Sequence, residues 1–121
     1  MKRRDCWVLG FVLTLGGLAL ANPTAAEQAR IDKLIQAVAH RTDIKFVRNG
    51  SEYSSVQAGE FLQGKLKWRL SKVSSAQDFI VQIGTRSTSS GDIYQVRLSD
   101  GRMVPSAVFL QQELERIERR R

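Results

Sequence analysis

The chain has 121 residues, the length of one domain, and a formal net charge of +7 at pH 7. It contains one cysteine, Cys6, and one histidine, His40, which excludes an internal disulfide framework and a cysteine- or histidine-rich zinc site. The positive balance suits acidic partners such as nucleic acid, anionic lipid headgroups or acidic glycans.

Residues 1–21 have the pattern of a secretory signal peptide. Residues 2–4 are positively charged, residues 7–20 form an apolar run, and a small-x-small cleavage motif ends at Ala21. The run is shorter than the ~20 residues that a membrane-spanning helix needs. We therefore expect export to the periplasm, with cleavage after Ala21 or, alternatively, after Ala26. Export disfavours nucleic acid as the partner and leaves a mature chain without cysteine, which packing alone must stabilise.

The residues after the leader predict a linker and a first helix. Residues 22–27 are a polar, alanine-rich linker. Apolar residues then recur at helical spacing and predict an amphipathic helix over about 25–40: Ile31, Leu34, Ile35 and Val38. His40 lies at its end, where a cation suits the helix dipole, so we interpret it as a helix-end residue and not as a catalytic base.

Residues 44–57 predict a short strand, a turn and the start of a second helix. The strand covers 44–48, with Ile44 and Phe46 facing inward. Asn49-Gly50 predicts a turn, because both residues tolerate positive φ. The segment from Ser54 to Gln57 matches the S-x-x-Q capping box that begins a helix.

The second helix carries apolar, aromatic and basic residues. An apolar residue recurs at every fourth position, and we expect these to be buried: Ala58, Leu62, Leu66 and Leu70. Phe61 and Trp68 lie on a neighbouring stripe, and we expect them to widen the core face; an exposed aromatic patch for a partner is the alternative. The basic residues are Lys65, Lys67, Arg69 and Lys72. They either keep the helix soluble or face an anionic surface.

The remaining chain predicts a third helix, a polar loop, a hairpin and a last helix. A capping sequence at Ser74-Ser75, with Asp78 in the first turn, begins a helix of about ten residues that ends near Gly84. Residues 85–91 form a polar loop, residues 92–98 alternate as a strand, and Asp100-Gly101 turns the chain into residues 102–104. Ser106 is expected to cap the last helix, with Ala107, Leu110, Leu114 and Ile117 inward and Glu113, Glu115 and Glu118 outward.

This order of elements predicts an α+β fold, in which four helices pack on one side of a small sheet of about three short strands. We expect one domain over residues 28–118, followed by a basic tail at 119–121.

Five segments resemble one protein family in order and spacing: FVRNGSEY, SSVQAGEFLQGKLKW, SSAQDFI, TRSTSSGDIYQVR and PSAVFLQQEL. They resemble the small exported bacterial proteins of domain-of-unknown-function family 5329, over residues 28–118. The resemblance implies export and the extent of the domain, and it brings no established activity. It also implies a histidine where this chain has Phe61, and cysteines in some members where Ile44 and Leu98 stand. Phe61 therefore argues against a chemistry that needs this histidine, and Ile44 and Leu98 are expected to face each other across strands.

Two polar loops form the candidate binding site. The first supplies Arg48, Asn49, Gly50 and Tyr53, and the second supplies Arg86, Ser87, Ser89 and Ser90. If the strand ending at Arg48 and the strand beginning near Asp92 are neighbours, the loops meet at one edge. They could then bind a carboxylate, phosphate or sulfate through forked arginine hydrogen bonds. In the competing interpretation, Asn49-Gly50 only turns the chain and the serines only cap and solvate a loop.

Catalytic and cofactor chemistry has little support in the sequence. It contains no metal-ligand cluster and no glycine-rich phosphate motif, and isolated acids such as Glu52 and Glu60 are usually solvated. We therefore predict no catalytic residue, metal or cofactor, and favour a non-catalytic periplasmic binding or interaction module over an enzyme. Its partner would be an anionic small molecule, an envelope polymer or another exported protein. The alternative is a module that docks on anionic lipid through the second helix and the arginine tail.

Overall fold

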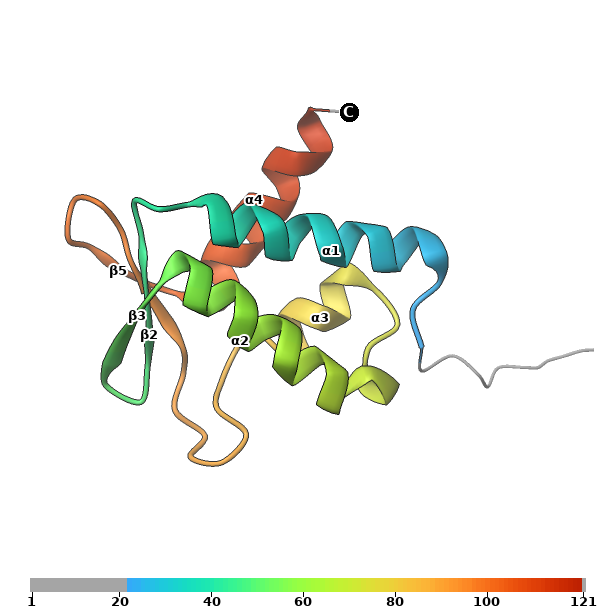
Figure 1. The fold of residues 1–121 in the computed structure, drawn as a ribbon, viewed down its shortest axis with the longest axis horizontal. Helices are drawn as coiled ribbons and strands as arrows, with labels where there is room; N and C mark the ends of the chain where they lie inside the picture. Colours follow the sequence, from blue (N-terminus) through green and yellow to red (C-terminus); the bar gives the residue numbers. More distant parts are fainter. Residues whose placement is uncertain (1–21, 121) are drawn as a thin grey trace, which may run out of the picture.

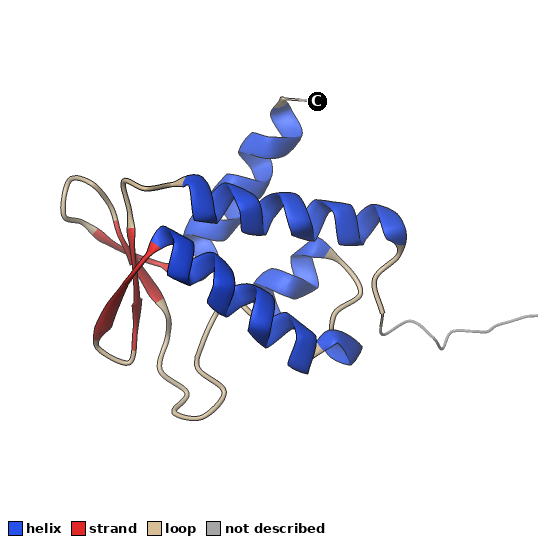
Figure 2. Cartoon of the chain, viewed as in Figure 1, coloured by secondary structure: helices blue, strands red, loops and turns tan. Residues whose placement is uncertain are grey.

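The computed structural model describes residues 22–120 (Figures 1 and 2). The predicted signal peptide at 1–21 and the last residue of the basic tail lie outside the described residues. The elements follow in the order α1 (Ala25–His40), β2 (Lys45–Arg48), β3 (Ser51–Ser54), α2 (Ser55–Trp68), the 3-10 helix η2 (Leu70–Lys72), α3 (Ala76–Gln82), β4 (Gln95–Arg97), β5 (Met103–Pro105) and α4 (Ser106–Arg119). Within residues 22–120, no helix combines the length and the apolar character needed to cross a membrane.

The strands gather at one end of the molecule, and the helices pack on the same side of the sheet (Figures 1 and 2). The sheet is antiparallel throughout, in the order β3-β2-β4-β5. The α+β class is therefore confirmed, with one strand more than the three that the sequence predicted.

The additional strand, β3, follows from the predicted Asn49-Gly50 turn. Asn49 has φ 52° and Gly50 has φ 82°, and Arg48 pairs with Ser51 across the two-residue turn. This backbone twist directs a returning strand alongside β2. The sequence of β3 is Ser-Glu-Tyr-Ser, which lacks the apolar alternation of a strand with one buried face. The turn, and not the hydrophobic pattern, therefore specifies β3.

Strand β2 also pairs with β4, and this pairing places the two candidate loops on one side of the sheet. Phe46 is opposite Val96, and Lys45 is opposite Arg97. Continuing the same register places Ile44 opposite Leu98, the two positions that the family resemblance linked. The antiparallel pairing therefore brings the Arg48 end of β2 beside the residues that precede β4.

Helices α1 and α2 match their predicted starts and core stripes. Helix α1 has the predicted bounds and buries Ile31, Leu34, Ile35 and Val38. The capping box of α2 is present: Ser54 Oγ accepts a hydrogen bond from the Gln57 amide at 3.1 Å, and Gln57 Oε1 accepts one from the Ser54 amide at 2.9 Å. Leu70 was predicted to be buried and is 37% exposed. This prediction is wrong because α2 ends at Trp68 and the chain turns into η2.

Helix α3 is shorter than predicted, with seven residues in place of about ten. The Ser75 hydroxyl caps it by accepting from the Asp78 amide at 3.0 Å. Its first amide, on Ala76, donates to Glu27 of α1 at 2.8 Å. This hydrogen bond lowers the pKa of Glu27, and the hydrogen bond from Arg30 is the second cause of the same shift. The side chain thus ties the start of α3 to α1.

Helix α4 corrects two predictions. Ser106 does not cap it: Pro105 is the N-cap residue, and the Ser106 amide donates to the Tyr94 carbonyl, which extends the β4–β5 pairing up to the first residue of the helix. Glu113 was predicted to face outward and is 2% exposed. It is buried because Arg41 and Arg116 each place a guanidinium nitrogen 2.6 Å from its carboxylate.

Candidate functional site

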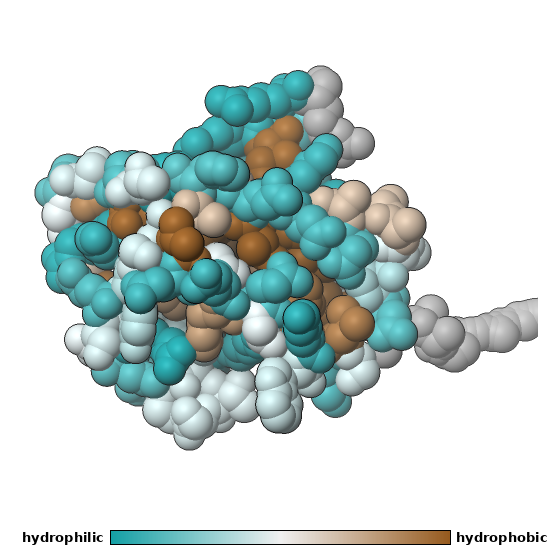
Figure 3. Space-filling view, viewed as in Figure 1, coloured by the Kyte–Doolittle hydropathy of each residue, from teal (hydrophilic) through white to brown (hydrophobic). Residues whose placement is uncertain are grey.

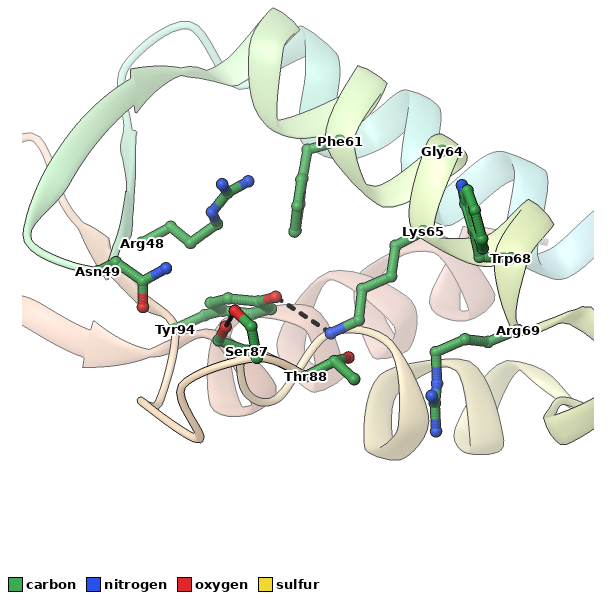
Figure 4. Close-up of a pocket in the computed structure, with 11 residues that line it drawn as sticks. Arg48, Asn49, Phe61, Gly64, Lys65, Trp68, Arg69, Ser87, Thr88 and Tyr94 are labelled. Atoms are coloured by element: carbon green, nitrogen blue, oxygen red, sulfur yellow. Dashed lines mark hydrogen bonds between the residues drawn. The ribbon is translucent and has the colours of Figure 1, made fainter.

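A cavity of about 540 Å³ opens between α2, the end of β2 and the loop that precedes β4 (Figure 4). We call it the basic cavity. It is lined by Arg48, Asn49, Phe61, Gly64, Lys65, Trp68, Arg69, Ser87, Thr88, Ser89 and Tyr94. Three of these residues carry cations, three are aromatic, and none carries a carboxylate.

The two polar loops of the sequence prediction meet at this cavity. The Ser90 hydroxyl donates a hydrogen bond to Asn49 Oδ1 at 2.8 Å. Two hydrogen bonds inside the second loop also fix its shape. The Ser90 amide donates to Ser87 Oγ at 3.3 Å, and the Ser87 amide donates to the Asp92 carbonyl at 2.8 Å. The loop therefore has a defined shape beside Asn49, and its hydroxyls stand at the cavity wall.

Arg48 closes one end of the basic cavity. Its guanidinium lies 4.5 Å from the centre of the Phe61 ring and 5.6 Å from that of Tyr53, both within the range of cation–π attraction. Within residues 22–120 it forms no ion pair with a carboxylate. The aromatic rings thus position the charge and leave its hydrogen-bond donors available to a ligand.

Lys65 lies in the middle of the cavity (Figure 4). Its Nζ donates to the Tyr94 hydroxyl at 3.0 Å and to the Arg86 carbonyl at 2.7 Å. Burial lowers the pKa of Lys65 to about 8, and the nearby charges of Arg69 and Arg48 act in the same direction. Burial also raises the pKa of Tyr94, against the opposing effect of the Arg48 charge. At neutral pH the tyrosine therefore keeps its proton while the lysine is partly neutral.

Trp68 and Arg69 border the cavity where α2 ends. Trp68 is 89% exposed, so the prediction that it widens the core face is wrong, because the last residue of α2 extends past the core. Phe61, two turns earlier, packs against the core and meets the Tyr94 ring edge-on at 5.5 Å. The Nε atom of Arg69 is buried and has no hydrogen-bond partner among the described residues.

Part of the predicted set of binding residues lies at the basic cavity. Arg48, Asn49, Ser87 and Ser89 line the basic cavity, and Ser90 contacts Asn49. Gly50, Tyr53 and Arg86 do not line it. Arg86 is exposed and contributes its carbonyl oxygen to Lys65.

The contribution of α2 was missed by sequence reasoning. Phe61, Lys65, Trp68 and Arg69 all line the cavity, together with Gly64. They are spaced by about four residues, so they share one face of the helix. This stripe of alternating aromatic and basic residues is the available signal, but its spacing is the same as that of a core extension beside solubilising charges.

The other polar residues considered in the sequence lie elsewhere. His40 Nδ1 is 2.8 Å from the Gln36 carbonyl at the end of α1, and Glu52 pairs with Arg97 at 2.6 Å. Glu60 borders a separate apolar groove between α1 and α2, visible in Figure 3 and lined also by Ile35, Ala39, Val56 and Gly59. That groove carries one acid, Glu60, and one base, Lys67, so no single charge dominates it.

Comparison with known proteins gives a family and one curated relative. The model of the family of unknown function DUF5329 matches residues 25–118. The uncharacterized protein YfeK of Salmonella typhimurium strain LT2 is 35% identical over 94 residues, which cover 78% of this chain and 77% of that protein. No solved structure matches this chain significantly.

Proposed function

The chain belongs to DUF5329, a family of unknown function, and we propose that it is an exported module that binds a small anionic ligand in the basic cavity. One observation carries the proposal: Arg48, Lys65 and Arg69 line one cavity, and no carboxylate of residues 22–120 lines it. Like charges in one cavity repel, and the lowered pKa of Lys65 reflects burial first and this repulsion second. A bound anion would offset the repulsion and accept hydrogen bonds from the cations.

The walls of the cavity indicate the rest of the ligand. Phe61, Trp68 and Tyr94 present aromatic surface beside the cations, and Ser87 and Ser89 offer hydroxyls. Ligand sites are commonly apolar cavities of about 300–1,000 Å³ with a few placed polar groups. The basic cavity, at about 540 Å³, has this size and composition. We therefore assign it a ligand that joins a carboxylate, phosphate or sulfate to an apolar body.

The proposal of export rests on the signal-peptide pattern, and α1 favours one cleavage site. Thr24 is the N-cap of α1, and its hydroxyl accepts a hydrogen bond from the Glu27 amide at 3.2 Å. Cleavage after Ala21 keeps this cap, whereas cleavage after Ala26 would remove it together with the first two residues of the helix. Loss of such a cap costs about 1 kcal/mol. We propose that the leader is removed after Ala21, in the periplasm.

Titration with 3-phenyllactate, a carboxylate on an aromatic body, tests the anion-binding function. We expect a saturable change in tryptophan fluorescence, with affinity that falls as NaCl is added because salt screens the cations. The change should be absent in Trp68→Phe, which would show that the fluorescence signal comes from Trp68 and not from Trp7. Uncharged 3-phenyllactamide should bind far more weakly. Equal responses to the acid and the amide, or no response to either, would contradict the proposal.

Docking on anionic lipid is the second candidate, and the exposure of Trp68 favours it. This ring is 89% exposed at the end of α2, with Lys67 and Lys72 nearby in the chain. Tryptophan beside lysine suits a membrane interface. The C-terminal end of α4, with Arg119 and Arg120, projects on another side of the molecule, so one flat surface would not meet both regions (Figure 1).

Co-sedimentation with vesicles that contain an anionic phospholipid separates the two candidates. Lipid docking requires pelleting at low salt that is lost in Trp68→Ser. If the module instead binds a small anion, we expect the unmodified chain and Trp68→Ser to show the same background pelleting. Arg48→Met should then weaken the binding of 3-phenyllactate.

A further inference from the structure

Lys65 differs from the other lysines in the described part of the chain. It is partly buried, whereas Lys33, Lys45, Lys67 and Lys72 are exposed. Its Nζ forms hydrogen bonds to two uncharged acceptors, the Arg86 carbonyl and the Tyr94 hydroxyl. No carboxylate in residues 22–120 forms an ion pair with it. This is an amine held inside a cavity without the acid that would fix its proton.

We propose that Lys65 captures a small 2-oxo carboxylate by forming a reversible imine with its carbonyl carbon. The inference rests on the anion-binding function proposed above and adds the chemical class of the ligand. Arg48 and Arg69 lie on either side of Lys65 in the cavity (Figure 4). In a 2-oxo acid the carbonyl is bonded directly to the carboxylate. An arginine that binds the carboxylate therefore leaves the carbonyl within reach of the amine between them.

The amine must be neutral to attack, and its surroundings favour this form. Desolvation and neighbouring cations are the two established ways to activate a lysine nucleophile. Burial is the larger cause here, and the charges of Arg69 and Arg48 add to it, which together lower the pKa of Lys65 to about 8. About one molecule in ten then has a neutral amine at pH 7, against fewer than about one in a thousand for an ordinary lysine.

The reaction balances with groups that are present. The Nζ lone pair attacks the carbonyl carbon, the C–N bond forms, the C=O π pair moves to the oxygen, and one amine proton passes to that oxygen to give a neutral carbinolamine. The hydroxyl then takes the second amine proton and leaves as water while the C=N bond forms. Addition of water reverses the step, and no oxidant or second reactant is needed.

Tyr94 is placed to assist this proton transfer. Its hydroxyl lies 3.0 Å from Nζ, and its raised pKa keeps it protonated. It can therefore donate a hydrogen bond to the carbonyl oxygen during attack and to the departing hydroxyl afterwards. The loop that completes the wall contributes Ser87, Thr88 and Ser89, which are uncharged at these pH values. Among the described residues, the charged groups that line the cavity with Lys65 are thus Arg48 and Arg69.

Reductive trapping tests the inference. The full chain is incubated with phenylpyruvate and sodium cyanoborohydride, and adducts are located by peptide mapping, which separates Lys65 from the terminal amine. At pH 7 we expect Lys65 to be labelled at least about tenfold faster than Lys67, which lies exposed on the same helix. The ratio of Lys65 to Lys67 labelling should stay constant up to about pH 8 and then fall, because the neutral fraction of Lys65 saturates there while that of an exposed lysine still rises.

Two controls separate capture from structure. Lys67→Arg should leave the labelling of Lys65 unchanged, and Lys65→Arg should remove the selective adduct. In the unmodified chain, 3-phenyllactate should slow the labelling of Lys65, which makes the test independent of the folding of any variant. Labelling spread evenly over the lysines, or unaffected by 3-phenyllactate, would overturn the inference.

The same experiment separates this inference from the function on which it rests. If 3-phenyllactate and phenylpyruvate bind equally and no adduct forms at Lys65, imine capture is wrong and the anion-binding function stands. If neither compound binds and no adduct forms, both are wrong.

Discussion

Replacing Glu113 by alanine is expected to lower the free energy of unfolding by about 3 kcal/mol. The Glu113 side chain is 3% exposed, and its Oε2 lies 2.6 Å from a guanidinium nitrogen of Arg41 and 2.6 Å from one of Arg116. Removing the acid leaves Arg41, which lies 5.2 Å over the Phe109 ring, with Asp43 as its remaining partner. A cation that loses its buried partner keeps its desolvation cost, which is why the loss is large.

Glu115→Ala is the matched control for this prediction. Glu115 is on the same helix, two residues further on, and is exposed. Its replacement should change the free energy of unfolding by less than about 0.5 kcal/mol. Urea denaturation followed by circular dichroism measures both variants, with equal m-values required for the comparison. Equal stabilities for Glu113→Ala and Glu115→Ala would show that the Arg41–Glu113–Arg116 cluster contributes nothing.

Replacing Arg48 by methionine is expected to weaken the binding of 3-phenyllactate about 10- to 100-fold. A hydrogen bond to a charged group is worth about 1.5–3 kcal/mol, and this variant removes the donors at one end of the cavity. Methionine keeps an unbranched apolar side chain against Phe61, so we expect little change in stability. Fluorescence titration at constant salt gives the two affinities.

Arg86→Met provides the control with the same change in charge. Arg86 was predicted from the sequence as a binding residue, but its side chain does not line the basic cavity. We expect its replacement to change the affinity less than about twofold, an effect of long-range charge alone. If Arg86→Met weakens binding as much as Arg48→Met, the ligand is bound by the two loops as first predicted, and not inside the cavity.

The sequence predicted those elements whose signals are local. The position of α1 follows from apolar spacing whose last member is Val38, two residues before the helix ends, and the start of α2 follows from the Ser54 capping box. Strand β3 could not be predicted in this way, because it is polar and forms only where the turn returns the chain to β2. The burial of Glu113 could not be predicted from the local sequence pattern either, because its partner Arg41 is 72 residues away in the chain.

The candidate site was predicted in part for the same reason. Loop composition indicated Arg48, Asn49 and the serines, but their contact depends on the pairing of β2 with β4. The contribution of Lys65 depends on which face of α2 turns toward Tyr94, and that is set by tertiary packing. A charge on a helix is usually solvated, so sequence alone favoured an exposed Lys65, which is partly buried in the structure.

The most direct test of an anion-binding basic cavity is an NMR titration of the ¹⁵N-labelled chain with 3-phenyllactate. We predict that the amide signals that shift belong to Asn49, Lys65 and residues 87–89, together with the indole N–H of Trp68. All of these residues line the cavity. Shifts confined to the groove between α1 and α2 or to the end of α4, or no shifts at all, would contradict the account.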